Sequence, residues 1–90
     1  MKMQAVSWEF IDDGGVPWEV HAKTYWRQQV YCCRDQGHCV GMFDPQEPGR
    51  PEPDTSSWPD AVQEKWRFAV EAARAVHKMR EVIAKKAVRR

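Results

Sequence analysis

Residues 5 to 22 read AVSWEFIDDGGVPWEVHA, and this stretch decides the fold. Apolar and polar side chains alternate on both sides of DDGG, which is the pattern of two strands that each bury one face. The apolar positions are Val6, Trp8, Phe10, Val16, Trp18, Val20 and Ala22. The stretch therefore predicts a β-hairpin whose apolar face joins the core.

The register of this hairpin follows from matching apolar residues with apolar residues across the two strands. A three-residue loop at positions 13 to 15 places Phe10 opposite Trp18. It also places Glu9 opposite Glu19 on the other face. A two-residue loop would set an apolar residue against a glutamate. We therefore expect the three-residue loop, which ends in a left-handed glycine.

A second hairpin is predicted further along, with DQG at positions 35 to 37 as its loop. Thr, Tyr, Trp, Val and Cys are common in its arms, and these residue types favour strands. In this register Cys33 faces Cys39 and Val30 faces Met42.

A helix is the alternative for residues 24 to 36, because their apolar side chains also fit helical spacing and Gly37 would cap it. Both interpretations stay open, so the predicted antiparallel sheet has three or four strands.

Residues 44 to 57, DPQEPGRPEPDTSS, hold four prolines and no large apolar side chain. This composition predicts an extended connector that crosses the sheet. PQEP and PGRP also fit the PxxP pattern of ligands for proline-recognition domains. We prefer the connector, which needs no partner.

Residues 58 to 88 are predicted to form one long helix, with Ser57 as its N-cap and Pro59 in its first turn. Its apolar arc is wider than the stripe needed to cover one sheet. The residues of that arc are Val62, Phe68, Trp66, Ala69, Val70, Ala72, Ala73, Ala75, Val76, Met79, Val82 and Ala84. We therefore expect either a homodimer through this helix or strands that curl round to cover it.

The 90 residues have the size of one domain. We expect an α+β fold in which hairpins over residues 1–43, a connector over 44–57 and a helix over 58–88 form a single unit. The charge is unevenly placed: residues 1–57 carry five basic and nine acidic side chains, and residues 58–90 carry nine and four. The two parts have opposite signs, which matters for partners.

The cellular location is predicted from the lack of signal-peptide and membrane-span segments and from the number of cysteines. The sequence has no apolar run as long as a signal peptide or a membrane span, so we expect a cytoplasmic protein that does not enter the membrane. Three cysteines are an odd number, which favours reduced thiols over a disulfide framework.

A metal site is not expected in YCCRDQGHC, residues 31 to 39. Zinc needs a tetrahedral set of N and S ligands. Neighbouring strand residues point to opposite faces, so only Cys33 and Cys39 converge, and His38 lies on the wrong side. A disulfide between these two cysteines under oxidation is an alternative to plain thiols. We predict no metal and no cofactor.

Enzyme activity is not expected either. A nucleophilic cysteine needs a positioned histidine and an oxyanion site, and His38 diverges from Cys39 along the strand. The sequence shows no phosphate-binding glycine loop and no catalytic carboxylate pair.

A protein partner is expected on the solvent face of the sheet, where carboxylates lie beside aromatic rings. Two facing glutamates cost stability, which suggests that the acidic strip serves a cationic partner. The candidate residues are Glu9, Asp12, Asp13, Glu19, Tyr25, Tyr31 and Phe43.

Nucleic acid is the alternative partner, because cations recur along one face of the helix at the spacing that phosphates could contact. The candidate residues are Arg67, Arg74, Lys78, Lys85 and Arg89. Glu71 and Glu81 interrupt this face. We therefore favour a small non-enzymatic protein-binding protein, an adaptor or inhibitor of the kind that phages and plasmids encode against host machinery.

Overall fold

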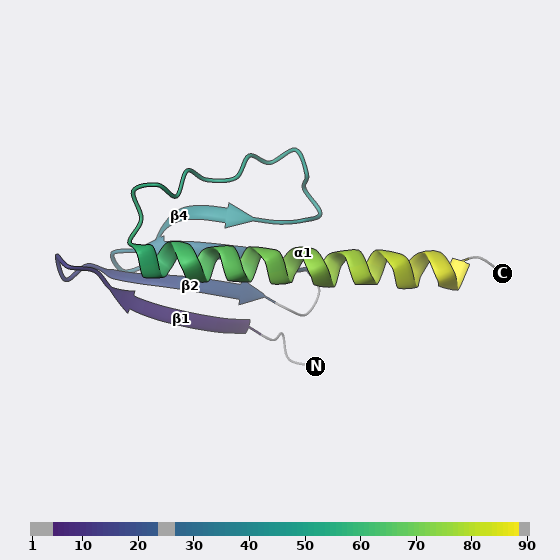
Figure 1. The fold of residues 1–90 in the computed structure, drawn as a ribbon, viewed down its shortest axis with the longest axis horizontal. Helices are drawn as coiled ribbons and strands as arrows, with labels where there is room; N and C mark the ends of the chain where they lie inside the picture. Colours follow the sequence, from purple (N-terminus) through teal and green to yellow (C-terminus); the bar gives the residue numbers. More distant parts are fainter. Residues whose placement is uncertain (1–4, 24–26, 89–90) are drawn as a thin grey trace.

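Four antiparallel strands and one helix make up the fold in the computed structural model, which describes residues 5–23 and 27–88. The elements are β1 (Ala5–Ile11), β2 (Pro17–Lys23), β3 (Val30–Arg34), β4 (His38–Phe43) and α1 (Asp60–Val88). The strands lie in the order β1-β2-β3-β4, and α1 runs along one face of the sheet (Figure 1). The predicted α+β architecture is confirmed, with four strands.

The predicted register of β1 and β2 is confirmed. Phe10 pairs with Trp18, and Glu9 pairs with Glu19. Gly15 has a φ of 81°, the left-handed conformation that glycine adopts without strain. The alternation of apolar residues was sufficient here because a shift of one residue would have moved every apolar side chain to the solvent face.

Strand β3 occupies part of the range for which a helix was the alternative, so the helix is wrong for the described residues 27–36. The pairing of Cys33 with Cys39 is as predicted. Beyond this pair the register shifts, and Val30 lies opposite Phe43 rather than Met42. The shift is a β-bulge, in which β4 holds one extra residue.

The bulge turns Phe43 to the helix side of the sheet. Phe43 packs against the core, and the Arg74 guanidinium of α1 lies 4.9 Å from the centre of its ring. The prediction of Phe43 on the solvent face is therefore wrong. The cause is the extra residue in β4, which reverses the faces of the residues that follow it.

The connector over residues 44–57 has no helix or strand and leads from the end of β4 to the start of α1 (Figure 1). Asp44 anchors its beginning and is only 2% exposed. The carboxylate of Asp44 accepts hydrogen bonds from Arg27 Nη2, from Gln29 Nε2 at 3.0 Å and from the Gln46 amide at 2.8 Å. These donors compensate for the burial of its charge.

The helix begins at Asp60, so the predicted start at residue 58 and the predicted N-cap at Ser57 are wrong. Gln63 N donates to the Pro59 carbonyl, which places Pro59 in the capping position. Trp58 lies just before the helix, where its indole enters the core. Gln63 Nε2 donates to the Trp58 carbonyl at 2.7 Å.

Tryptophan rings organise the core between the sheet and the first half of α1. The Trp58 ring lies 6.1 Å from that of Trp18 and 5.4 Å from that of Trp66, centre to centre. Aromatic pairs at these separations add to the hydrophobic free energy of burial. The buried apolar residues are Trp18, Val20, Val30, Cys32, Trp58, Val62, Trp66, Ala69, Val70 and Ala73.

The core ends at Ala73, while α1 continues past the sheet (Figure 1). The side chains of Met79 and Ile83 are 63% and 60% exposed. None of the four strands curls round to cover this part of the helix, so that alternative is wrong for the part of the chain that the structure describes.

Candidate functional site

The sheet has one face that no described element covers. We call it the outer face, and it consists of the side chains opposite to those that meet α1. Its residues are Ser7, Glu9 and Ile11 on β1, Pro17, Glu19, His21 and Lys23 on β2, Tyr31 and Cys33 on β3, and Cys39 and Met42 on β4. This mixture of acidic, aromatic and apolar groups is the most distinctive exposed surface of the sheet.

Two glutamates face each other on this outer face, because Glu9 and Glu19 are a register pair of β1 and β2. Glu19 Oε1 lies 2.8 Å from His21 Nε2, and His21 Nδ1 lies 2.9 Å from Ser7 Oγ. This chain of contacts fixes the Glu19 carboxylate. Across residues 5–23 and 27–88, no cation pairs with Glu9. Glu9 therefore presents an exposed negative charge that no described cation neutralises.

A shallow hollow of about 240 Å³ lies beside these carboxylates. Glu9, Glu19, Pro17 and Cys33 line it, together with residues of the β3–β4 loop. Trp18 and Arg34 line it as well, and the Arg34 guanidinium lies 5.1 Å from the centre of the Trp18 ring. Two carboxylates and one arginine that stacks on an indole ring thus share the lining of this hollow.

Tyr31 is held firmly in place on the outer face. Its hydroxyl donates to Gln29 Oε1 at 2.9 Å, and Lys23 Nζ lies 5.3 Å from the centre of its ring. Gln29 in turn donates to the buried Asp44. A tyrosine fixed in this way loses little conformational entropy when a partner packs on it.

The remaining predicted partner-binding residues are not brought together. Asp13 is exposed at the tip of the β1–β2 loop. Asp12 instead holds that loop, since its carboxylate accepts from the amides of Gly14 and Val16 at 2.9 Å and from Trp18 Nε1 at 3.0 Å. Those hydrogen bonds, the one from Trp18 above all, lower the pKa of Asp12.

The last two predicted residues are Phe43 and Tyr25. Phe43 lies on the helix side, as described above, and Tyr25 lies outside the described residues. Of the seven predicted residues, Glu9, Glu19 and Tyr31 share the outer face.

Three outer-face residues were missed. Ile11 is 76% exposed and pairs with Pro17 at the end of the face, and its place in the alternation could have revealed it. His21 contacts Glu19, which is two positions earlier on the same strand. The alternation places both side chains on the same face, so this contact could have been predicted. Met42 reaches this face only through the bulge, for which Gly41 was the one available signal.

The cysteines lie as predicted, with Cys33 opposite Cys39 and with Cys32 buried. Burial raises the pKa of Cys32 to about 12. Burial also raises the pKa of Cys33, helped by Cys39 and Glu19. Thiols with raised pKa values are weak nucleophiles at neutral pH. Within the described ranges no three His, Cys, Asp or Glu side chains are grouped to hold a metal ion.

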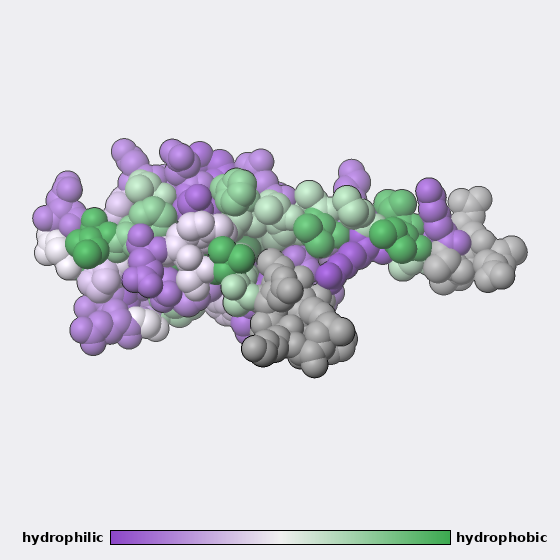
Figure 2. Space-filling model, turned by 90° about the horizontal axis from the view of Figure 1, so that it is seen from below, coloured by the Kyte–Doolittle hydropathy of each residue, from purple (hydrophilic) through white to green (hydrophobic). Residues whose placement is uncertain are grey.

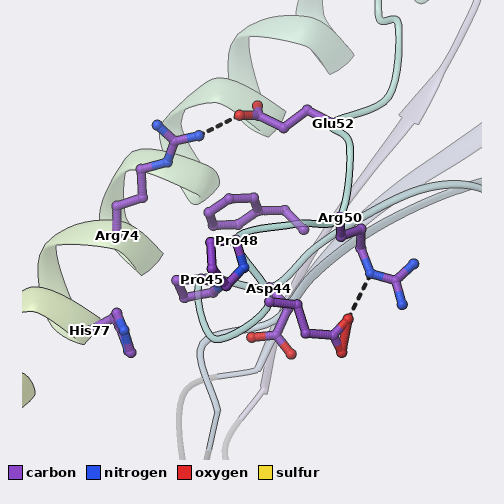
Figure 3. A pocket seen from close by; sticks show the side chains of 9 residues that line it. Asp44, Pro45, Pro48, Arg50, Glu52, Arg74 and His77 are labelled. Carbon is purple, nitrogen blue, oxygen red and sulfur yellow. Dashed lines mark hydrogen bonds and ion pairs between the residues drawn. The ribbon is translucent and has the colours of Figure 1, made fainter.

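The basic residues predicted to bind nucleic acid have different surroundings in α1. Arg67, Lys78 and Lys85 are exposed, and Arg89 lies outside the described residues. Arg74 reaches across to the connector and pairs with Glu52 (Figure 3).

That ion pair borders a second hollow, of about 320 Å³, between α1 and the connector. Asp44, Pro45, Pro48, Arg50 and His77 are among its lining residues (Figure 3). Arg50 is also paired, with Glu47. The two arginines among its described lining residues, Arg50 and Arg74, are thus both paired with carboxylates.

The chain was compared with protein-family models, curated proteins and solved structures, and no match was found. Among the described residues, no helix combines the length and the apolar character needed to cross a bilayer.

Proposed function

We propose that this protein is a small, non-enzymatic binding protein that holds another protein against the outer face of its sheet. The observation that carries the proposal is the pair of facing carboxylates, Glu9 and Glu19, on a face that no described element covers. In this role the protein acts as an adaptor or an inhibitor, by occupying a surface of its partner.

The facing glutamates favour a cationic partner for a physical reason. Like charges directly opposite each other on neighbouring strands destabilise a sheet. His21 engages Glu19 but not Glu9. A lysine or arginine of a partner, placed in the hollow beside both carboxylates, would relieve the repulsion and neutralise Glu9.

Apolar groups around the carboxylates supply the rest of the contact. Tyr31 and Met42 lie on one side of the glutamates, and Ile11 and Pro17 lie on the other. Binding free energy at protein interfaces is concentrated in a few apolar anchors surrounded by polar groups. The outer face has this composition.

A nucleic-acid interface on α1 is the weaker candidate. Arg74 forms an ion pair with Glu52 and lies over the ring of Phe43. Glu71 is exposed among the remaining basic residues of α1. We therefore expect any duplex binding to be weak and steeply dependent on salt.

Capture of partners from a nuclease-treated lysate tests the proposal. The baits are the wild-type protein, the double variant Glu9→Lys/Glu19→Lys, and the control Glu81→Lys, which reverses an exposed charge on α1. We expect wild type and control to retain the same polypeptide and the double variant to lose it. Equal capture by all three, or loss of capture after nuclease treatment, contradicts the proposal.

A further inference from the structure

From Phe68 onward, one side of α1 presents apolar side chains that are more than one-third exposed. Phe68, Met79 and Ile83 are 59%, 63% and 60% exposed, and Val76 and Val82 are 38% and 47% exposed. Figure 2 shows this apolar surface continuing along α1 past the sheet. Exposed apolar residues that adjoin one another in this way mark an interaction surface.

Three of these residues, with two alanines between them, follow a heptad pattern. Successive members of one row are alternately four and three positions apart along the sequence. We call this row the seam, and its residues are Phe68, Ala72, Ala75, Met79 and Val82. Such spacing keeps one stripe of a helix facing a partner helix. The seam differs from the stripe that meets the sheet, which includes Val62, Trp66, Ala69 and Ala73.

Charges beside the seam indicate the direction of the partner helix. Glu64, Glu71, Lys78 and Lys85 recur every seven residues, and all four are exposed. The two glutamates therefore precede the two lysines along one row. When two copies of this helix run antiparallel, Glu71 of each lies beside Lys78 of the other, and Glu64 beside Lys85. The row is complementary to itself only in this direction.

The groove between β1 and α1 supplies a second feature that calls for a partner. Its volume is about 120 Å³, and Val6, Trp8, Phe68 and Val76 are among its lining residues. Gln28 also lines it, is 4% exposed, and has an Nε2 group with no hydrogen-bond partner within residues 5–23 and 27–88.

We propose that two copies of the chain pair antiparallel through the seam of α1, and that the projecting end of each helix covers the β1–α1 groove of the other. In the register set by the charges, Ala72 of each copy lies opposite Ala75 of the other, and Met79 opposite Phe68. The small alanines at the centre let the two helices approach closely, while Met79 and Val82 reach the groove.

The arrangement has twofold symmetry, as expected for a homodimer whose two copies use the same surface. Lys65 fits beside Val82 of the second copy, since its ammonium group already lies 5.0 Å from the Trp8 ring centre and 5.1 Å from that of Phe68. Its alkyl chain can then cover apolar surface while the charge stays in water. The outer face of the sheet stays free, so the dimer would present two partner sites.

Sedimentation velocity of the full chain over a concentration series tests the pairing. We expect wild type to reach twice the 10.5 kDa chain mass at micromolar concentration. The double variant Met79→Glu/Val82→Glu should stay monomeric, and its circular dichroism should show that α1 persists. The control Arg67→Glu changes an exposed residue outside the seam and should dimerise like wild type. A wild-type monomer at all concentrations overturns the proposal.

A charge exchange tests the antiparallel direction separately. Glu71→Lys and Lys78→Glu should each raise the dimer Kd about tenfold, because each creates two like-charge contacts per dimer. The double variant Glu71→Lys/Lys78→Glu should return to within about twofold of wild type, since the contacts are restored with exchanged signs. If the double variant does not recover the wild-type Kd, the antiparallel register is wrong. A chain whose α1 binds another helical protein but does not bind a second copy of itself also overturns the proposal.

Discussion

Gly41 of β4 lies beneath Trp58, so closely that a β-carbon at position 41 would be 3.0 Å from Trp58 Cη2 and 2.8 Å from Pro53 Cγ. The connector and the start of α1 thus rest directly on the backbone of β4. The bulge that sets the register of β3 and β4 is what places a glycine at this point.

Gly41→Ala should destabilise the protein by about 1–3 kcal/mol, because the added methyl group overpacks this contact. Urea unfolding followed by tryptophan fluorescence measures the effect. Gly49→Ala is the matched control, since a β-carbon there would meet no atom within 4 Å. Equal stabilities of the two variants would show that the connector does not press on β4.

Asp44 should make stability depend on pH in the acid range. Burial raises its pKa, but hydrogen bonds from Gln29, from the Gln46 amide and from Arg27 outweigh burial, and the pKa lies below the ordinary 3.8. Its contribution is therefore complete above the unfolded-state pKa and is lost as the pH falls through the lower folded-state value.

Asp44→Ala should cost about 2 kcal/mol at pH 7, since it leaves buried donors without an acceptor. The difference from wild type should narrow as the pH is lowered from 7 toward 2, because the wild-type carboxyl becomes protonated as the pH falls through its folded-state pKa. Urea titrations at both pH values measure this, with the exposed Asp13→Ala as control. A destabilisation that is the same at both pH values would contradict the account of Asp44.

The three cysteines should react with a thiol reagent at three different rates at pH 8. Cys39 is exposed and should react first, followed by the half-buried Cys33. Cys32 should react only after unfolding, because burial removes access and raises its pKa to about 12. Stoichiometric zinc in protein purified without chelator, or native reaction of all three thiols at one rate, would be incompatible with this structure.

The first hairpin was predictable to the residue, and the second was not. In β1 and β2 the large apolar side chains at every second position allow a single register. In β4 the sequence CVGMF offers only Gly41 as a hint of an extra residue, and the residues that pack on that glycine, Pro53 and Trp58, come much later in the chain.

The candidate site could be predicted only in part from the sequence. The opposition of Glu9 and Glu19 follows from the hairpin register alone. The sequence showed only that Asp12 is charged. It did not show that Asp12 holds the β1–β2 loop, because that depends on the hydrogen bond from the Trp18 indole to the Asp12 carboxylate. The start of α1 was misplaced because Trp58 precedes a proline, which disfavours helical conformation at Trp58, so the helix begins only after Pro59.

Titration of the partner captured by the wild-type protein tests the central claim most directly. Calorimetry would compare wild type with Glu9→Lys/Glu19→Lys on the outer face and with Arg67→Glu on α1, alongside wild type titrated with duplex DNA. We predict at least a tenfold loss of affinity for the outer-face variant, a change below about twofold for Arg67→Glu, and no tight duplex binding. Unchanged affinity of the outer-face variant, or tight duplex binding that Arg67→Glu weakens, would contradict the account.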